Sequence, residues 1–319
     1  MLQHELKARA RVVDECLGTI FEGASPEQLY RACTHYIYAG GKRLRPVVVM
    51  LACELSGGED DPIPCAAAVE LIHTFTLIHD DIMDRDELRR GIPTVHTLWG
   101  EAGAILAGDT LYSKAFETIA HSTMPPEKRS ECIAVLSRAC TSICEGQWMD
   151  MSFEDRASVS EQEYLEMVEK KTAVLYGAAA EVGGIVGGAS KGQREALYEF
   201  GRLCGIAFQI QDDVLDLVAS EDALGKDALS DIRQGKKTLI AIHALSKGAT
   251  IPAFGDTHAS TDELRRAMEV LETTGSIQYA MDTAQRYLAM AKAKLDVFED
   301  CEVKTLLLEL ADFLVSRGY

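Results

Sequence analysis

Regularly spaced aspartates are the residues of this chain best suited to chemistry. Asp80, Asp81 and Asp84 follow a mostly apolar stretch, 69–78, that lacks glycine and proline and so predicts a buried helix. On a helix, residues i and i+4 share one face, so Asp80 and Asp84 point the same way. Buried carboxylates are costly without cations, and such pairs suit hard divalent ions such as Mg2+. The segment therefore predicts a metal site.

The same pattern occurs again in Gln209–Asp216, after another apolar helical run. One motif of this kind could be a solvated helix end, but two copies on apolar helices favour a functional site. If the motifs face each other, their six carboxylates carry a formal charge that about three Mg2+ ions would balance. The ions could hold a diphosphate leaving group, and an apolar pocket could protect the resulting carbocation from water.

Basic residues near these motifs suit phosphate oxygens. Arg89 and Arg90 follow the first motif, and Lys42 and Arg45 surround a helix start after Gly40–Gly41, where free N–H groups also favour anions. Each cation alone is typical of an ordinary surface charge, and it is the placement beside the motifs that points to diphosphate. Further candidates, inside an apolar run or near the loop after the second motif, are Lys171, Thr172, Lys226 and Lys236.

Composition excludes several classes of protein. The net charge of −18 argues against binding to nucleic acid or to anionic membranes. No apolar run approaches the roughly 20 residues of a membrane span, and the polar segment 1–5 does not begin a signal peptide. Nine cysteines without a Cys-x-x-Cys pair are typical of buried, reduced thiols. We therefore expect a cytoplasmic protein with no membrane span.

Helical periodicity dominates the chain. No proline lies between Pro126 and Pro252, and apolar residues recur every three or four positions. These features predict an all-α fold, and the absence of a linker predicts one domain over residues 1–319. Helices are expected over residues 2–20, 26–38, 46–55, 63–84, 102–120, 127–151, 161–171 and 193–218, followed by a charged loop at 220–235 and three or four more helices.

Two local patterns refine this expectation. Ser160–Glu163 has the sequence of a capping box, which predicts a helix start. The pairs Gly183–Gly184 and Gly187–Gly188 recur at four-residue spacing. A dinucleotide-binding loop would need a preceding strand, and none is evident, so we interpret these glycines as sites of close helix packing or as a helix end.

The motifs together resemble those of a known family. Gly-Gly-Lys-Arg-Leu-Arg-Pro, Asp-Asp-Ile-Met-Asp with Arg-Arg-Gly, Lys-Thr, and Gln-Ile-Gln-Asp-Asp-Val-Leu-Asp occur in the order seen in the trans-isoprenyl diphosphate synthases, or polyprenyl synthetases. The resemblance covers about residues 25–245 and, in helix pattern, the rest of the chain. It implies an all-α, single-domain bundle of about a dozen helices around a central cavity, a homodimer and dependence on Mg2+.

The resemblance also implies roles for single residues. The metal ligands fall on Asp80, Asp84 and Asp212, with Asp81, Asp213 and Asp216 as their partners at the metal site. The isopentenyl diphosphate site falls on Lys42, Arg45, His73 and Arg90. The allylic diphosphate site falls on Arg89, Lys171, Thr172, Gln209, Lys226 and Lys236. The residues expected to act in catalysis are Asp80, Asp84, Lys171 and Asp212.

The implied reaction is a Mg2+-dependent head-to-tail (1'-4) condensation. Diphosphate leaves an allylic substrate, the double bond of isopentenyl diphosphate attacks the cation, and a proton is lost, with the released diphosphate as the expected acceptor. Lys171 and groups near Thr172 could stabilise the cation. The allylic substrates would be dimethylallyl, geranyl and farnesyl diphosphate.

Product length depends on bulk just before the first motif in this family. Phe75 and Thr76 lie five and four residues before Asp80, with no insertion in the motif, and this combination resembles the archaeal type of geranylgeranyl diphosphate synthase. Helix geometry alone favours Thr76 as the floor, and the family favours Phe75. One departure is Leu229, which stands where relatives usually have glycine.

Three alternatives stay open. The product could be farnesyl diphosphate or a longer polyprenyl diphosphate. A class I terpene cyclase shares the ionisation chemistry, but it needs no isopentenyl site and its second motif is usually mixed Asn/Ser/Glu. A non-catalytic subunit tends to lose one or both motifs, whereas both are intact here.

Overall fold

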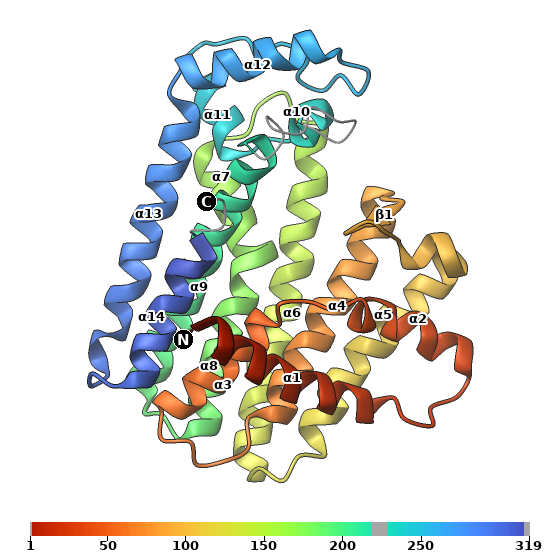
Figure 1. The fold of residues 1–319 in the computed structure, drawn as a ribbon, viewed down its shortest axis with the longest axis vertical. Coiled ribbons are helices and arrows are strands. Elements are labelled where there is room, and N and C mark those ends of the chain that lie inside the picture. The colour runs from red at the N-terminus through yellow and green to blue at the C-terminus, as the bar shows by residue number, and fades with distance from the viewer. Residues whose placement is uncertain (1, 219–228, 316–319) are drawn as a thin grey trace. The chain divides into compact units, whose positions relative to one another are not determined.

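The computed structural model describes residues 2–218 and 229–315 of the chain. Lys226, a predicted contact of the allylic diphosphate, lies outside these residues. Helices dominate what is described, and the predicted all-α class is confirmed (Figure 1). In chain order the elements are α1 Leu2–Ile20, α2 Glu27–Tyr38, α3 Leu44–Leu55, α4 Ile63–Asp84, β1 Leu88–Arg89, β2 Ile92–Pro93, α5 Val95–Ala120, α6 Pro126–Glu154, α7 Glu161–Val168, the π-helical turn η1 Glu169–Ala173, α8 Val174–Gly187, α9 Lys191–Val218, α10 Ser230–Gln234, α11 Leu239–Ser246, α12 Thr261–Thr273, α13 Ser276–Lys294, the 3-10 turn η2 Leu295–Val297 and α14 Glu302–Val315.

Most predicted helix boundaries agree with these elements, but the structure differs from the prediction in three places. The fifth helix begins at Val95 rather than near 102, because Gly100 forms a kink with a φ of 75° and does not start the helix. The break at 91–93 is a small antiparallel hairpin of β1 and β2. Part of the predicted loop 220–235 is the short helix α10. The hairpin and α10 carry too few residues to give a periodic signal in the sequence.

The chain divides into two compact units. Unit 1 comprises residues 1–140, 178–197 and 300–307, and it contains the first aspartate motif. Unit 2 comprises residues 141–177, 198–299 and 308–319, and it contains Lys171 and the second motif. The single domain over residues 1–319 stays a prediction.

Unit 1 is built around α4, which carries the first motif at its C-terminal end. This helix packs against α5, α3 and α1, and Figure 1 shows α4 and α5 side by side. Val69, Leu71, Ile72 and Ile78 are completely buried, as expected for an apolar helix in a core. Burial on this scale stabilises α4 by roughly 2 kcal/mol per large side chain.

Close packing in unit 1 depends on glycine. A β-carbon at Gly183 would collide with the Val49 carbonyl, and one at Gly187 would collide with the Cys53 carbonyl, so α8 contacts the backbone of α3 directly. The predicted role of these glycines in helix packing is confirmed. The structural reason is that glycine alone lacks the side chain that would hold the helices apart.

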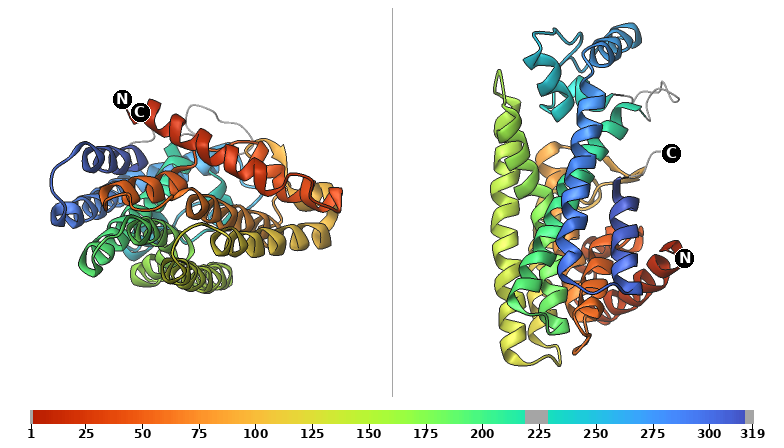
Figure 2. Two further views of the ribbon diagram at one scale, coloured as in Figure 1. Left: turned by 90° about the horizontal axis from the view of Figure 1, so that it is seen from below. Right: turned by 90° about the vertical axis from the view of Figure 1, so that its left-hand side faces the viewer.

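In unit 2, α13 packs against α11 and α12, and α11 packs against α7 (Figure 2). The predicted capping box is confirmed: Ser160 accepts a hydrogen bond from the Glu163 N–H, and the Glu163 carboxylate accepts from the Ser160 N–H at 2.9 Å. All nine cysteines are free thiols, in agreement with the prediction of reduced cysteines. Among residues 2–218 and 229–315, no helix is both long and apolar enough to cross a membrane.

Candidate active site

The outer and inner aspartates of the first motif lie in different environments. Asp80 is half-buried and Asp84 is exposed, on the last turns of α4. Asp81, between them, is completely buried. The helix ends at Arg85, whose left-handed backbone has a φ of 59° and whose N–H donates to the Asp81 carbonyl. The sequence predicted one face for Asp80 and Asp84, and the helical geometry of this turn agrees with it.

Asp81 is held by protein donors on both of its oxygens. The buried Tyr36 hydroxyl, from α2, donates a short hydrogen bond to Oδ2, and the Nε of Arg89 donates to Oδ1 at 2.6 Å. Burial raises the pKa of Asp81, and the Tyr36 and Arg89 donors oppose this rise. The same two contacts fix the direction of the Arg89 guanidinium, a predicted contact of the allylic diphosphate.

The hairpin of β1 and β2 separates the two arginines that follow the motif. Arg90 and Gly91 form its turn with φ angles of 53° and 78°. Two residues with positive φ match the right-handed twist of the strands in a two-residue hairpin. As a result Arg89 is half-buried and contacts Asp81, whereas Arg90 is exposed and its Nη1 donates to the Gly40 carbonyl at 3.1 Å.

Unit 1 brings together the four residues predicted to bind isopentenyl diphosphate. Arg45 Nη1 lies 3.2 Å from His73 Nε2, and Arg90 contacts the turn just before Lys42. Burial, and then Arg45 and Arg90, lower the pKa of His73 well below its usual value. Arginine has no lone pair to offer, so His73 Nε2 accepts and the imidazole is neutral. His73 therefore orients Arg45 without adding a charge of its own.

The inner aspartate of the second motif is buried like Asp81. Tyr164, from α7, donates to Asp213 Oδ2 at 2.6 Å, and the Gln209 amide donates to Oδ1 at 3.0 Å. The Thr172 hydroxyl in turn donates to Gln209 Oε1 at 3.0 Å. Burial, and then repulsion by Asp231, raise the pKa of Asp213 to about 7. Two predicted allylic contacts, Thr172 and Gln209, thus belong to one hydrogen-bonded chain with Asp213.

Lys171 lies in the π-helical turn η1 and pairs with Asp150 of α6 at 2.5 Å. A β-carbon at Gly146 would collide with the backbone of Lys171, and one at Gly205 would lie 2.6 Å from the Ala173 Cα. Helices α6 and α9 therefore approach this turn at backbone distance. Turns of this kind widen a helix locally and are frequent at functional sites. The glycines hold the turn, and with it Lys171 and Thr172, in a defined position.

Asp216, the last aspartate of the second motif, is joined to α10. It accepts from the Ser230 hydroxyl at 3.2 Å and from the Asp231 N–H at 3.4 Å. Leu229 precedes this helix with a φ of 59° and is 4% exposed. Glycine adopts this backbone readily, so the leucine carries local strain, while its burial offsets part of the cost.

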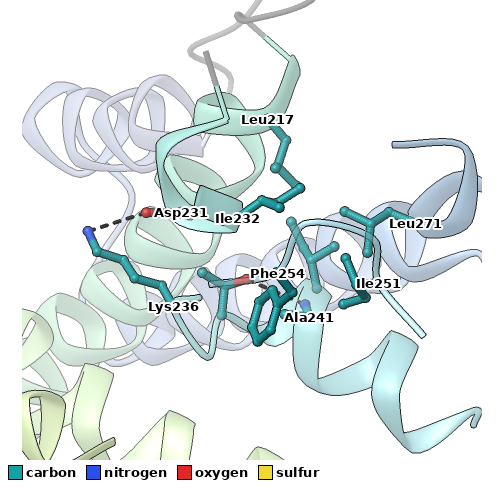
Figure 3. A pocket seen from close by; sticks show the side chains of 10 residues that line it. Leu217, Asp231, Ile232, Lys236, Ala241, Ile251, Phe254 and Leu271 are labelled. Atoms are coloured by element: carbon teal, nitrogen blue, oxygen red, sulfur yellow. Dashed lines mark hydrogen bonds and ion pairs between the residues drawn. The ribbon is translucent and has the colours of Figure 1, made fainter. Parts of the chain in front are cut away.

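Lys236, another predicted allylic contact, forms an ion pair with Asp231 at 3.3 Å. Both residues line a small pocket whose other walls are mainly apolar, including Leu217, Ile251 and Phe254 (Figure 3). Its volume of about 10 Å³ is the size of a single water molecule. This pocket is therefore too small for a prenyl chain.

Within the described part of the chain, no three His, Cys, Asp or Glu side chains converge into a ready metal cage. The donor set still fits Mg2+, because this ion keeps several waters and is held by one or two carboxylates together with substrate phosphates. Asp80 and Asp84 on one turn of α4 offer such a pair. The partners of Asp81 and Asp213 occupy both of their oxygens, which agrees with a supporting role for these two residues.

Phe75 and Thr76, the predicted chain-length residues, differ in their contacts. Phe75 is buried and packs edge-on against His79 and against Tyr112 of α5, with ring centroids 5.7 and 5.3 Å apart. The Thr76 hydroxyl donates to the His73 carbonyl within its own helix at 2.8 Å. Phe75 therefore joins an aromatic cluster, whereas the hydrogen bond described for Thr76 is local to its own helix.

Several residues of these networks were not found from sequence. Tyr36 and Tyr164 give no signal, because nothing in a single sequence pairs them with Asp81 and Asp213. Gln147 and Asp150 could have been found as polar residues on the inner face of a long helix. Gln147 is 6% exposed, and within the described residues neither atom of its amide has a hydrogen-bond partner.

Comparison with known proteins agrees with this geometry. The family model for polyprenyl synthetase matches residues 26–293. A geranylgeranyl diphosphate synthase of Methanosarcina mazei is 53% identical, with 100% of this chain and 98% of that protein covered. A geranylfarnesyl diphosphate synthase of Natronomonas pharaonis is 43% identical, with 100% and 98% covered.

Solved structures give the same result. A geranylgeranyl pyrophosphate synthetase from the archaeon Geoglobus acetivorans matches with a TM-score of 0.92 and 47% identity, over 98% of this chain and 99% of that one. A polyprenyl synthase of Caulobacter crescentus, complexed with calcium and isoprenyl diphosphate, matches with a TM-score of 0.85 and 34% identity, over 99% and 96%. This chain belongs to the polyprenyl synthetase family of prenyltransferases, as its motifs predicted.

Proposed function

We propose that this prenyltransferase condenses isopentenyl diphosphate with dimethylallyl, geranyl and farnesyl diphosphate in a Mg2+-dependent reaction, with geranylgeranyl diphosphate as the main product. The observation that carries the proposal is the matched pair of motifs. In each, the inner aspartate is buried against a tyrosine hydroxyl, and the first and last aspartates flank it at the motif's spacing. The name of the Methanosarcina mazei relative supports the product.

In this proposal Asp80, Asp84 and Asp212 hold the metal ions. Bound Mg2+ would supply neutralisation of the charge that develops on the departing diphosphate. Arg89 and Lys171 contribute cations toward the same diphosphate, and their carboxylate partners Asp81 and Asp150 orient them. A preset orientation lowers the reorganisation that ionisation requires.

The second substrate would bind in the cluster of Lys42, Arg45, His73 and Arg90. Arg45 and Arg90 suit two diphosphate oxygens, because a guanidinium presents paired donors. The neutral His73 keeps Arg45 in place by accepting a hydrogen bond from it.

The Thr172 hydroxyl and the Gln209 amide, linked to each other at 3.0 Å, would lie beside the allylic carbon and stabilise its positive charge through their oxygens.

The assay supplies isopentenyl diphosphate and Mg2+ with each of the three allylic primers, and the dephosphorylated products are separated by chromatography. A twenty-carbon product from every primer is expected. A twenty-five-carbon product would favour the second candidate, a geranylfarnesyl diphosphate synthase, which the Natronomonas pharaonis relative supports. A farnesyl end product would contradict both, and no product with any primer would remove the synthase function.

Product length gives a sharper test. Phe75→Ala removes a ring that packs against Tyr112, so longer products are expected. Thr76→Ala is the matched control, because the hydrogen bond described for Thr76 is local to its helix. An unchanged product spectrum in Phe75→Ala, or a larger change in Thr76→Ala, would contradict the assignment of Phe75 as the residue that limits product length.

The homodimer is also a proposal. Ile105 and Tyr112, two turns apart on α5, are 46% and 38% exposed, and the neighbouring Leu106 is 58% exposed. An apolar helical face of this kind is costly in water and suits a second copy of the chain. Light scattering should give twice the chain mass, and Leu106→Glu should reduce it; a monomeric wild type would contradict the dimer. The cytoplasmic location is part of the same proposal, and the nine free thiols support it.

A further inference from the structure

We propose that Arg43 is a positioning residue for the isopentenyl diphosphate site, and that its buried guanidinium holds the turn carrying Lys42. This inference rests on the proposed function, since it assigns a role within that site. Arg43 differs from the cations beside it in the same motif. Lys42 is exposed and Arg45 is half-buried, whereas Arg43 is only 5% exposed.

The guanidinium of Arg43 bonds in three directions to three helices. Its Nε donates to Asp14 of α1 at 2.7 Å, its Nη1 donates to Glu70 of α4 at 2.6 Å, and its Nη2 donates to the Ile37 carbonyl of α2 at 2.6 Å. Glu70 is itself buried, at 5% exposure. Two carboxylates therefore balance the charge, and the rigid fork of donors is locked in one orientation.

These contacts distinguish Arg43 from the residues that would bind diphosphate, because its guanidinium donors bond to protein groups. Burial alone would lower its pKa, but Glu70 and Asp14 outweigh that effect and raise it. The guanidinium stays charged and its charge is directed at the two carboxylates of α1 and α4. Arg43 thus acts on the site through the backbone of its turn rather than by contact with a substrate.

The backbone at Arg43 shows what these contacts hold in place. Its φ of 48° and ψ of 38° are left-handed, a conformation that is unfavourable for a non-glycine residue. Such a conformation persists only where surrounding contacts determine it. Arg43 is also the residue before α3, and its carbonyl accepts the first helical hydrogen bond from Val47 at 3.0 Å. The orientation of Arg45, in the first turn, follows from this start.

The turn itself packs on two guanidinium groups. A β-carbon at Gly41 would lie 3.0 Å from Arg43 Nη1 and 3.5 Å from Arg90 Nη1. Arg90 in addition donates to the Gly40 carbonyl at 3.1 Å. Loss of Arg43 would therefore release Lys42 together with one of the supports of Arg90. We expect the effect to fall on isopentenyl diphosphate, because the contacts described for this turn go to Arg43 and to Arg90, a residue predicted for that substrate.

The test measures steady-state kinetics of Arg43→Met with each substrate varied in turn. The KM for isopentenyl diphosphate should rise about tenfold or more, and the KM for farnesyl or geranyl diphosphate should stay within about twofold. Arg43→Met leaves Glu70 buried without its cation, which would lower the Tm. The double variant Arg43→Met/Glu70→Gln removes that charge, so its Tm should recover toward the wild type while its KM for isopentenyl diphosphate stays raised.

Arg9→Met is the matched control. Arg9 joins α1 to α3 through Glu54 at 2.6 Å and does not contact the turn, so this variant should keep both KM values. An unchanged KM for isopentenyl diphosphate in Arg43→Met would overturn the proposal. So would recovery of that KM together with the Tm in the double variant. No product from the wild type with any primer would instead overturn the proposed function, and this inference with it.

Discussion

Asp81 and Asp213 hold the same place in the two aspartate motifs but are held by different partners. Each is buried and accepts a hydrogen bond from a tyrosine hydroxyl on another helix. The second oxygen of Asp81 faces the cation of Arg89 at 2.6 Å, whereas that of Asp213 accepts from the neutral Gln209 amide at 3.0 Å. Arg89 opposes the rise in the pKa of Asp81, and Asp231 adds to the rise for Asp213.

This difference suggests two uses for one motif. In unit 1 the inner aspartate orients Arg89, the arginine proposed to bind the allylic diphosphate, by charge. In unit 2 the inner aspartate orients Gln209 and, through it, Thr172 by neutral hydrogen bonds. Asp231 and Asp212 add negative charge around Asp213, so we expect the folded structure to depend more on bound metal at the second motif than at the first.

The outer aspartates should behave alike in both motifs. Asp80→Ala and Asp212→Ala each remove a proposed metal ligand, so kcat should fall by about a thousandfold or more in either variant. Steady-state turnover with saturating Mg2+ measures this loss, and far-UV circular dichroism controls for folding. Near-normal activity in one variant would remove that motif from the metal site.

The inner aspartates should differ. Asp81→Asn deprives Arg89 of its carboxylate, and we expect kcat/KM for the allylic substrate to fall about 10- to 100-fold. In Asp213→Asn the single amide oxygen can still accept from Gln209, and the new NH2 can donate to the Tyr164 oxygen, so a fall below about tenfold is expected. Equal losses in the two variants would contradict the contrast between charged and neutral partners.

The pH dependence of stability should locate the uncompensated charge in the second motif. The pKa of Asp213 is raised from 3.8 to about 7, so its stabilising contribution is complete below pH 3.8 and is lost as the pH rises through 7. In EDTA, Asp213→Asn should remove part of the fall in Tm between pH 5 and 8. A Tm profile parallel to that of the wild type would show that folding does not raise the pKa of Asp213.

The tyrosines should give the smallest effects. Tyr164→Phe and Tyr36→Phe each delete one hydroxyl donor to a buried aspartate, at a cost of about 1–3 kcal/mol. The loss should be greater for Tyr164→Phe above pH 7, because the described hydrogen-bond partners of Asp213 are both neutral, whereas Asp81 pairs with Arg89. Thermal unfolding at pH 8 without metal compares the two variants, and a larger loss in Tyr36→Phe would reverse the order.

Much of the fold could be predicted because helical periodicity is a local signal. The apolar run before Asp80 predicted α4 at its observed residues, and Ser160–Glu163 predicted the start of α7. The hairpin at 88–93 was missed because it is too short to give a periodic signal, and α10 was missed because its conformation also depends on contacts with residues outside it. Leu229 shows this directly: its left-handed backbone precedes α10, whose first residues bind Asp216.

The sequence by itself determined the class of fold, the two aspartate motifs and the cations that accompany them, because residue types and short spacings carry that information. Only the tertiary structure decided which partners each residue has. It distinguished buried Asp81 and Asp213 from their outer neighbours, and buried Arg43 from exposed Lys42. The physical reason is that burial and pairing depend on helices distant in sequence, and these alone decide whether a charge faces solvent or another charge.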